Sequence, residues 1–243
     1  MTQSTPPLLS MARIPKILHQ TYSDKSLAAE VAANMKKLIG QNPGWTHAFY
    51  DDKDRFDFIR SHYDLRVLTA YNRINPMYGA ARADFFRYLL IYKVGGVYID
   101  LKSGASKSLD EITANHQYLL SNWDNGPTGV NPGYGMHFSN LPRGEFQQWH
   151  VAAVPGHPFL KAVIDRVLGN IESYTVERFG VGFGGVLHTT GPVPYTLAIL
   201  PLVNTAEHHY QTTNQQMGFI YNMLTAEHRN LMHTDRRPHY VTL

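Results

Sequence analysis

The feature that most constrains the fold is a long apolar helix that runs directly into a short apolar strand. Gly79–Val94 carries Ala, Phe, Tyr, Leu and Ile on nearly every face of the expected helix, and Gly95 and Gly96 then close it. A helix that is apolar on all sides has to be buried. Val97–Ile99 follows as a strand, with Asp100 at its carboxyl end. The segment therefore predicts a buried helix followed by an inner strand of a sheet.

The rest of the amino-terminal half repeats this alternation of strand and helix. The patterns predict strands at 14–19 and 45–50 and helices at 27–39, 55–63 and 65–74. The polar stretch after the first strand, HQTYSD, is the first candidate loop. Strands alternating with helices are typical of the α/β class, in which ligands bind at the carboxyl ends of the strands.

Signals in the second half are weaker. Asn122–Gly135 predicts a long loop, a strand is possible at 151–154, and helices are expected at 158–171 and 192–202. The glycine-dense stretch 179–191 predicts another loop, because it lacks the Lys-Ser/Thr ending of a phosphate-binding loop. The tail from Thr205 is rich in His and Tyr and shows no clear periodicity.

Composition narrows the class of protein. A chain of 243 residues with 43% hydrophobic residues can form one core, so we expect a flexible leader at 1–13 and a single domain at 14–243. A net charge of +3 is too small to indicate nucleic-acid binding. The chain has no Cys, and its longest apolar run, Val193–Val203, is too short to span a membrane. We therefore expect a cytoplasmic protein with at most peripheral contact to the inner face of a membrane.

Four charged residues in this region predict a binding site. Asp84 and Arg87 are three residues apart and share one face of the helix, and Asp100 and Lys102 share one face at the strand end. The plain alternatives are a surface salt bridge within the helix, a strand-end aspartate and a solvated lysine. Charged residues in such apolar surroundings are seldom buried without a partner or a function, which favours the site.

The same segment resembles the sugar-binding region of glycosyltransferase family 32 and its toxin-type relatives. The shared pattern is a helix with Asp-x-x-Arg, then Gly-Gly-x-Tyr, a short strand and a D-x-D motif, and IPKILHQTY, GHPFL and HTTGP resemble other family elements. The resemblance implies an α/β, GT-A-like nucleotide-sugar-binding domain with a mixed central sheet flanked by helices. It also implies transfer of a hexose from a nucleotide sugar to a glycan or glycolipid acceptor, with retention of configuration, in polysaccharide biosynthesis.

One residue departs from the family pattern. Lys102 stands where the family has the second Asp, which holds a divalent cation (Mn or Mg) against the donor diphosphate. A charged Lys cannot ligate a metal, but its ammonium can contact the diphosphate directly. The resemblance leaves Asp100 and a carboxyl-terminal His, of which we choose His233, as candidate metal ligands, and the use of a metal is open.

Residue by residue, the expected roles are these. Asp84, Asp100 and Lys102 are the candidate catalytic residues, and the donor is expected to contact His19, Gln20, Thr21, Tyr22, Asp51, Asp84, Arg87, Asp100 and Lys102. Tyr22 is a candidate for stacking on the base and Asp51 for a hydrogen bond to base or ribose.

Several assignments stay open at this stage. Trp123 and Trp149 belong either to an acceptor groove or to the core, and a nucleophilic carboxylate, if one is used, is Asp124 or Glu145. The alternative function is a non-catalytic protein of the same fold that binds a sugar nucleotide or glycan. A dinucleotide-dependent oxidoreductase lacks support, because the glycine fingerprint is missing.

Overall fold

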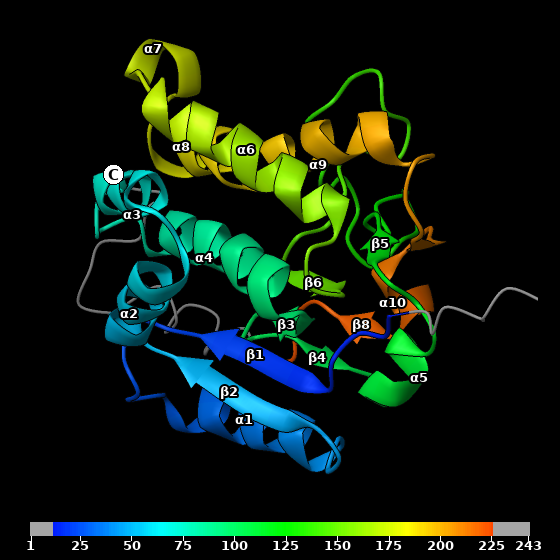
Figure 1. Cartoon of the computed structure of the whole chain (residues 1–243). Coiled ribbons are helices and arrows are strands. Elements are labelled where there is room, and N and C mark those ends of the chain that lie inside the picture. Colours follow the sequence, from blue (N-terminus) through cyan, green and yellow to red (C-terminus); the bar gives the residue numbers. More distant parts are fainter. Residues whose placement is uncertain (1–11, 226–243) are drawn as a thin grey trace, which may run out of the picture.

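A four-stranded mixed sheet forms the centre of the molecule. The computed structural model describes residues 12–225. The strands lie in the order β2-β1-β3-β6 (Figure 1), with β1 at Ile17–Thr21, β2 at Thr46–Tyr50, β3 at Gly96–Ile99 and β6 at His150–Ala153. β1 pairs in parallel with both β2 and β3, whereas β6 is antiparallel to β3. The predicted α/β class with a mixed central sheet is confirmed.

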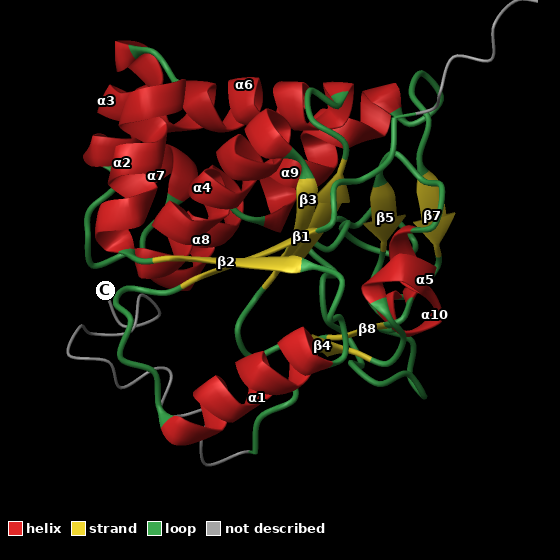
Figure 2. Cartoon of the chain, turned by 60° about the horizontal axis from the view of Figure 1, so that its bottom comes forward, coloured by secondary structure: helices red, strands yellow, loops and turns green. Residues whose placement is uncertain are grey.

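Helices cover both faces of this sheet unequally. α1 (Ala29–Gly40) lies on one side together with two very short helices described below, and the larger helical layer lies on the other (Figures 1 and 2). That layer contains α2 (Asp52–His62), α3 (Leu65–Arg73), α4 (Gly79–Val94), α6 (Pro158–Glu172), α7 (Val176–Phe179), α8 (Gly182–Thr189) and α9 (Pro192–Ile199), followed by the short 3-10 helix Leu200–Leu202. Apolar side chains from α4, α6 and α9 form most of the main core with the sheet.

Two small sheets attach the carboxyl-terminal segment to the domain. β4 (Gly104–Ala105) pairs antiparallel with β8 (Phe219–Ile220), and β5 (Leu119–Ser121) pairs in parallel with β7 (His209–Gln211). Two short helices, α5 (Leu109–Thr113) and α10 (Asn214–Met217), lie beside them (Figure 2). The sequence patterns predict none of these elements, because elements of two to five residues carry no measurable periodicity.

The junction between α4 and β3 fixes the helix against the sheet. Gly95 and Gly96 have φ values of +68° and +102°, which side chains rarely adopt. A Cβ atom at Gly96 would lie 2.6 Å from the carbonyl oxygen of Ile17 and 2.8 Å from Nε2 of His19. The chain can therefore turn from α4 directly into an inner strand only with glycine at this position.

The predicted helix at 79–94 has the bounds of α4, and residues 85, 86 and 88–91 are fully buried, as expected. Two other predictions differ from the structure. The first strand, expected at 14–19, runs from Ile17 to Thr21, so Gln20 and Thr21 are strand residues and not loop residues. The glycine-dense stretch at 179–191 contains α8, because its glycines let backbones approach: a Cβ at Gly185 would lie 2.8 Å from the carbonyl oxygen of Gly180.

Within residues 12–225, no helix has both the length and the apolar character needed to cross a membrane. The expected leader at 1–13 lies almost entirely outside the described residues.

Candidate functional site

A cavity of about 750 Å³ opens at the carboxyl ends of β1 and β3. Thr21 ends β1, and Asp100 follows β3; both line the cavity. The amino-terminal half of α4, one side of α8, the loop around Tyr134 and the segment 221–224 form the other walls. The site therefore lies where an α/β sheet is expected to bind its ligand.

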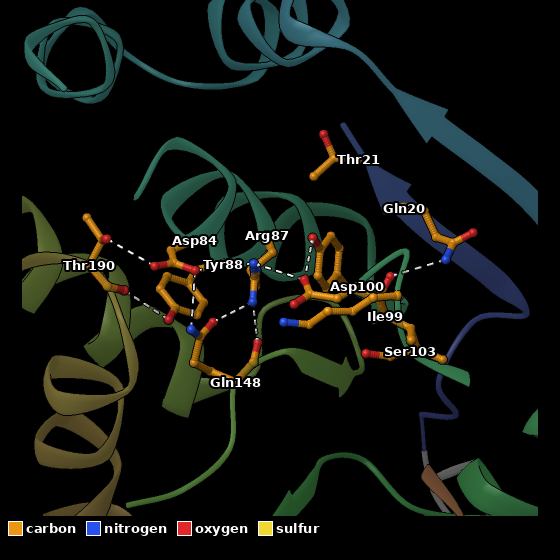
Figure 3. A network of polar contacts seen from close by, with 12 residues as sticks. Gln20, Thr21, Asp84, Arg87, Tyr88, Ile99, Asp100, Ser103, Gln148 and Thr190 are labelled. Atoms are coloured by element: carbon orange, nitrogen blue, oxygen red, sulfur yellow. Dashed lines mark hydrogen bonds and ion pairs between the residues drawn. The ribbon is translucent and has the colours of Figure 1, made fainter. Parts of the chain in front are cut away.

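An ion-pair network joins α4 to the end of β3 (Figure 3). A terminal nitrogen of Arg87 lies 3.2 Å from Oδ1 of Asp84 and 3.2 Å from Oδ1 of Asp100. The other terminal nitrogen donates to the backbone oxygen and to Oε1 of Gln148, at 2.8 and 2.6 Å. The guanidinium also lies over the ring of Tyr98, whose hydroxyl donates to Asp100. Arg87 thus fixes both carboxylates in place.

Two further donors hold Asp84. Nε2 of Gln148 donates to Oδ1 at 3.2 Å, and Oγ1 of Thr190 donates to Oδ2 at 3.1 Å. Burial raises the pKa of Asp84, and Arg87 opposes that shift. The side chains of Asp84 and Arg87 are each only 5% exposed, which excludes a solvated salt bridge on the helix surface.

Asp100 differs from Asp84 in its exposure. Its side chain is 24% exposed at the cavity wall, so part of the carboxylate faces the open space while Arg87 and Tyr98 hold Oδ1. A fixed carboxylate of this kind can accept hydrogen bonds from a sugar or ribose hydroxyl, and such bonds are short and directional.

Lys102 lies on the same wall, in the turn after Asp100. Nζ donates to the hydroxyl of Tyr221 at 2.8 Å and lies 4.3 Å from the centre of the Tyr221 ring. Burial opposes the charge of the ammonium, but attraction to Tyr221 and Asp100 is stronger and raises the pKa of Lys102. The side chain is therefore cationic at neutral pH.

Aromatic rings form another part of the wall. Trp123, Tyr134, Trp149 and Tyr221 all line the cavity and pack mainly edge to face, with 4.7 Å between the centres of Trp123 and Tyr221. The structure thus places both tryptophans at the cavity as well as in the apolar core. Such rings can stack on the apolar face of a sugar.

A buried carboxylate and a histidine accompany the aromatic wall. Oε2 of Glu145 lies 2.5 Å from Nδ1 of His137, and both residues line the cavity. Burial raises the pKa of Glu145, and His137 opposes the shift. Asp124, the other open candidate for a nucleophile, does not line the cavity; its carboxylate accepts from the backbone N–H of Val130.

The structure brings together six of the nine residues expected to contact the donor. These are Thr21, Tyr22, Asp84, Arg87, Asp100 and Lys102, all of which line the cavity. Their roles are predictions that the geometry allows.

His19, Gln20 and Asp51 do not line the cavity, which corrects their expected placement. Nε2 of His19 lies 3.0 Å from the carbonyl oxygen of Gly95, and Gln20 donates to the carbonyl oxygen of Ile99 at 3.4 Å. Both are buried strand residues that tie β1 to its neighbours. The carboxylate of Asp51 caps α2 by accepting from the N–H of Asp54 at 2.8 Å.

His233, the expected second metal ligand, lies outside the described residues. Within residues 12–225, no three His, Cys, Asp or Glu residues come together in a group able to hold a metal ion.

Several cavity residues escaped the sequence patterns. Gln148, His137 and Tyr221 lie in segments without periodicity. Thr190 does not line the cavity itself, but it reaches Asp84 across 106 residues of chain. The one sequence signal for Thr190 is HTTGP, which resembles a family element but indicates no role for this residue.

Comparisons with known proteins agree with this geometry. Residues 28–119 match the family described as "Glycosyltransferase sugar-binding region containing DXD motif". The mannosyl phosphorylinositol ceramide synthase SUR1 of Saccharomyces cerevisiae is 30% identical over 181 residues, which cover 74% of this chain and 40% of that protein. Inositol phosphoceramide mannosyltransferase 3 of Schizosaccharomyces pombe is 27% identical, with 75% and 44% covered.

A further relative is the initiation-specific alpha-1,6-mannosyltransferase of Schizosaccharomyces pombe, at 26% identity with 79% of this chain and 50% of that protein covered. The chain thus spans half or less of the length of these curated relatives.

Solved structures share the fold. The PaToxG glycosyltransferase superposes with a TM-score of 0.56 at 15% identity, covering 79% of this chain and 71% of that one. The UDP-bound glycosyltransferase domain of the YGT toxin gives 0.54 at 12% identity, covering 83% and 80%. The chain therefore has a GT-A fold, and the comparisons support an assignment to the glycosyltransferase family 32 type, with a sugar-binding region whose motif reads Asp-Leu-Lys in this chain.

Proposed function

We propose that this protein transfers a hexose from a nucleoside diphosphate sugar to a glycan or glycolipid acceptor. The observation that carries the proposal is the buried Asp84–Arg87–Asp100 network, which ends at a cavity large enough for a sugar nucleotide. The names of the relatives support a mannosyl donor and a glycolipid acceptor. The absence of Cys from the sequence supports a cytoplasmic, reducing compartment.

The donor would lie with its sugar against the α4–β3 end of the cavity. Asp100 accepts hydrogen bonds from donor hydroxyls, and Arg87 keeps that carboxylate oriented. Asp84 is buried deeper than Asp100; it pairs with Arg87, accepts from Gln148 and holds both side chains in place. Thr21 and Tyr22 line the cavity at the end of β1, where the base and ribose would lie.

The reaction breaks the bond between the anomeric carbon and the diphosphate oxygen, and the diphosphate leaves with the bonding electrons. An acceptor hydroxyl oxygen forms the new bond to the anomeric carbon. Its proton passes to a departing phosphate oxygen when both groups lie on the same face of the sugar. Negative charge grows on the diphosphate during this step, so fixed positive charge at the cavity accelerates it.

A divalent cation does not fit the donor set of residues 12–225. Asp100 is the motif's single carboxylate, its Oδ1 already accepts from Arg87 and Tyr98, and a lysine ammonium stands at the next motif position. Hard cations need several free oxygen ligands. We therefore assign the charge stabilisation to side chains of the cavity.

Retention of configuration follows from the same-face displacement that we propose. A double displacement would need a carboxylate below the anomeric carbon. Of the three carboxylates that line the cavity, Asp84 and Asp100 are held by Arg87, which leaves Glu145. The acceptor sugar would stack on the aromatic wall beside Glu145, where Nε1 of buried Trp149 has no hydrogen-bond partner among residues 12–225.

The test is a transfer assay with UDP and GDP hexoses, using the release of nucleoside diphosphate as the readout. We expect turnover by the wild-type protein and a loss of about 100-fold or more in kcat/KM for Asp100→Asn, because a charge-assisted hydrogen bond to the donor is lost. Asp165→Asn is the matched control, since this exposed carboxylate pairs only with Lys161 in the described part of the chain.

The same assay separates the second candidate function. Replacement of the motif's second Asp by Lys102 favours a non-catalytic sugar-nucleotide-binding protein. Such a protein would bind a nucleotide sugar in calorimetry and release no nucleoside diphosphate, which would contradict the transferase proposal.

A further inference from the structure

Three Lys and Arg side chains of the described chain line the cavity, and they differ in the groups that they already contact. Arg87 contacts two carboxylates, Asp84 and Asp100. Arg55 forms an ion pair with Asp52 and donates to Oγ1 of Thr21. Within residues 12–225, Lys102 has no carboxylate within ion-pair distance of Nζ; its side-chain partner is the neutral hydroxyl of Tyr221. Lys102 is therefore the cation of this cavity whose charge no carboxylate neutralises, so it is available to bind an anion.

The position of this ammonium is fixed by the carboxyl-terminal segment. The hydroxyl of Tyr221 accepts from Nζ, and the ring lies under the charge. The Tyr221 ring packs edge to face against Trp123, with centres 4.7 Å apart, so it cannot move freely. Cations over aromatic faces are attracted by the ring's quadrupole.

The backbone around Lys102 is held equally firmly. The N–H of Met223 donates to the carbonyl oxygen of Lys102 at 2.8 Å, and Oγ of Ser103 donates to the carbonyl oxygen of Tyr221 at 2.6 Å. Nδ2 of Asn34 donates to the carbonyl oxygen of Leu101 at 2.8 Å. A side chain that is held before the ligand arrives loses little entropy on binding.

We propose that Lys102, positioned by Tyr221, binds the diphosphate of the donor and takes the place of a divalent cation, so that donor binding needs no metal. This inference rests on the proposed function and assigns the charge-neutralising group of that site. Lys102 would be a binding and catalytic residue, because it contacts the leaving group, and Tyr221 a positioning residue.

Calorimetric titration of the full chain with UDP and with GDP tests the proposal, in EDTA and again in Mn²⁺. We expect the nucleotide that binds to have a Kd that changes by less than about threefold between the two conditions. Lys102→Met is expected to raise the Kd in EDTA by about tenfold or more, because it removes a charged hydrogen-bond donor to phosphate. Binding by the variant should also weaken less with added salt.

Lys107→Met is the matched control. Lys107 is exposed, does not line the cavity, and donates only to the carbonyl oxygen of Gln216 in the described structure. Its variant should bind as the wild-type protein does. Thermal unfolding of both variants shows whether they fold.

Tyr221→Phe tests the positioning role, because it keeps the ring and removes the hydroxyl. We expect a rise in Kd of about threefold to tenfold, and a double variant with Lys102→Met that binds no worse than Lys102→Met alone. Additive effects would show that Tyr221 acts independently of the ammonium.

The outcomes separate the two proposals. Binding that improves more than about tenfold on adding Mn²⁺, or a Lys102→Met variant that binds as the wild-type protein does, overturns the metal-free assignment and leaves the transferase proposal standing. If neither nucleotide binds in either condition, both proposals fail.

Discussion

At the scale of single residues, what surrounds a charge decides what it can do. The charge of Arg87 is neutralised by two carboxylates, and removing the Arg87 side chain would leave both carboxylates in a poorly solvated site. Lys102 rests on a neutral ring and hydroxyl. Arg87 therefore fixes the geometry of the site, whereas the charge of Lys102 is available to bind a ligand.

Another residue whose surroundings fix its charge is His150 in β6. It is 1% exposed, and its ring stacks on Phe219. Burial lowers the pKa of His150 to about 3, with a smaller contribution from Arg87. The folded protein therefore keeps this ring neutral at pH values where the unfolded chain binds a proton. The stability that results is present above about pH 6.5 and is lost as the pH falls toward the folded pKa.

We predict that replacing His150 by Gln flattens the pH dependence of stability. Between about pH 7.5 and about pH 5, this one group removes about 2 kcal/mol of unfolding free energy from the wild-type protein. Denaturant unfolding at the two pH values measures the difference. His62→Gln, at an exposed helix end, should keep the wild-type dependence. Equal pH dependence in wild type and His150→Gln would show that the ring is not held neutral.

At the scale of elements, the turn from α4 into β3 sets the register of the site. Asp84 and Arg87 lie on the helix, Asp100 follows the strand, and the two glycines between them fix how far apart the groups lie. A change in this turn would therefore reach both the stability of the core and the geometry of the cavity.

Gly96→Ala is expected to lower the unfolding free energy by at least about 2 kcal/mol, because the new Cβ meets backbone and a buried ring at a positive φ. Gly169→Ala is the control: this glycine lies inside α6 with open space around its Cβ position. That change should stabilise the protein by about 0.5–1 kcal/mol. Urea unfolding of both variants measures the effects, and a Gly96→Ala protein as stable as wild type would refute the steric argument.

The elements also show what sequence patterns can and cannot reveal. The Gly79–Val94 helix was predictable because sixteen apolar-rich residues end at two glycines. Helix α8 was not predictable, because several glycines in a row are typical of a loop. In the structure these glycines allow close approach of the backbone within a helix. Strand β8 has two residues and exists through its pairing with β4, so its formation depends on contacts far away in the chain.

The candidate site divides in the same way. Asp84, Arg87, Asp100 and Lys102 were predictable because their spacing within one segment brings them to one wall. Tyr221, Gln148 and His137 were not, because tertiary contacts alone bring them there. His19 was misplaced because it was expected at the end of the strand, facing a ligand, whereas β1 continues to Thr21 and the ring is buried beside Gly95.

At the scale of the whole molecule, one cavity joins segments that lie far apart in the chain. Residues near positions 21, 84, 100, 135, 186 and 222 share its wall. A ligand that fills the cavity stabilises the folded state and the contacts between these segments.

We predict that a bound nucleoside diphosphate slows amide hydrogen exchange in 100–105 and 219–224 together, because β4 and β8 pair beside the cavity and residues 102 and 221 lie on its wall. The β5–β7 pair does not line the cavity and serves as the internal reference. Hydrogen exchange followed by mass spectrometry measures both. Slower exchange in 100–105 with unchanged exchange in 219–224 would contradict the coupling.

The pairing of β4 with β8 has an evolutionary consequence. Lys102 and Tyr221 are 119 residues apart, and the matched family region ends at residue 119, well before the phenol. In homologous chains, a lysine in the motif and an aromatic hydroxyl at the distant partner position should be inherited as a pair. In a lineage with aspartate at the motif position, the tyrosine hydroxyl has no ammonium to position. The two columns of an alignment should therefore change together.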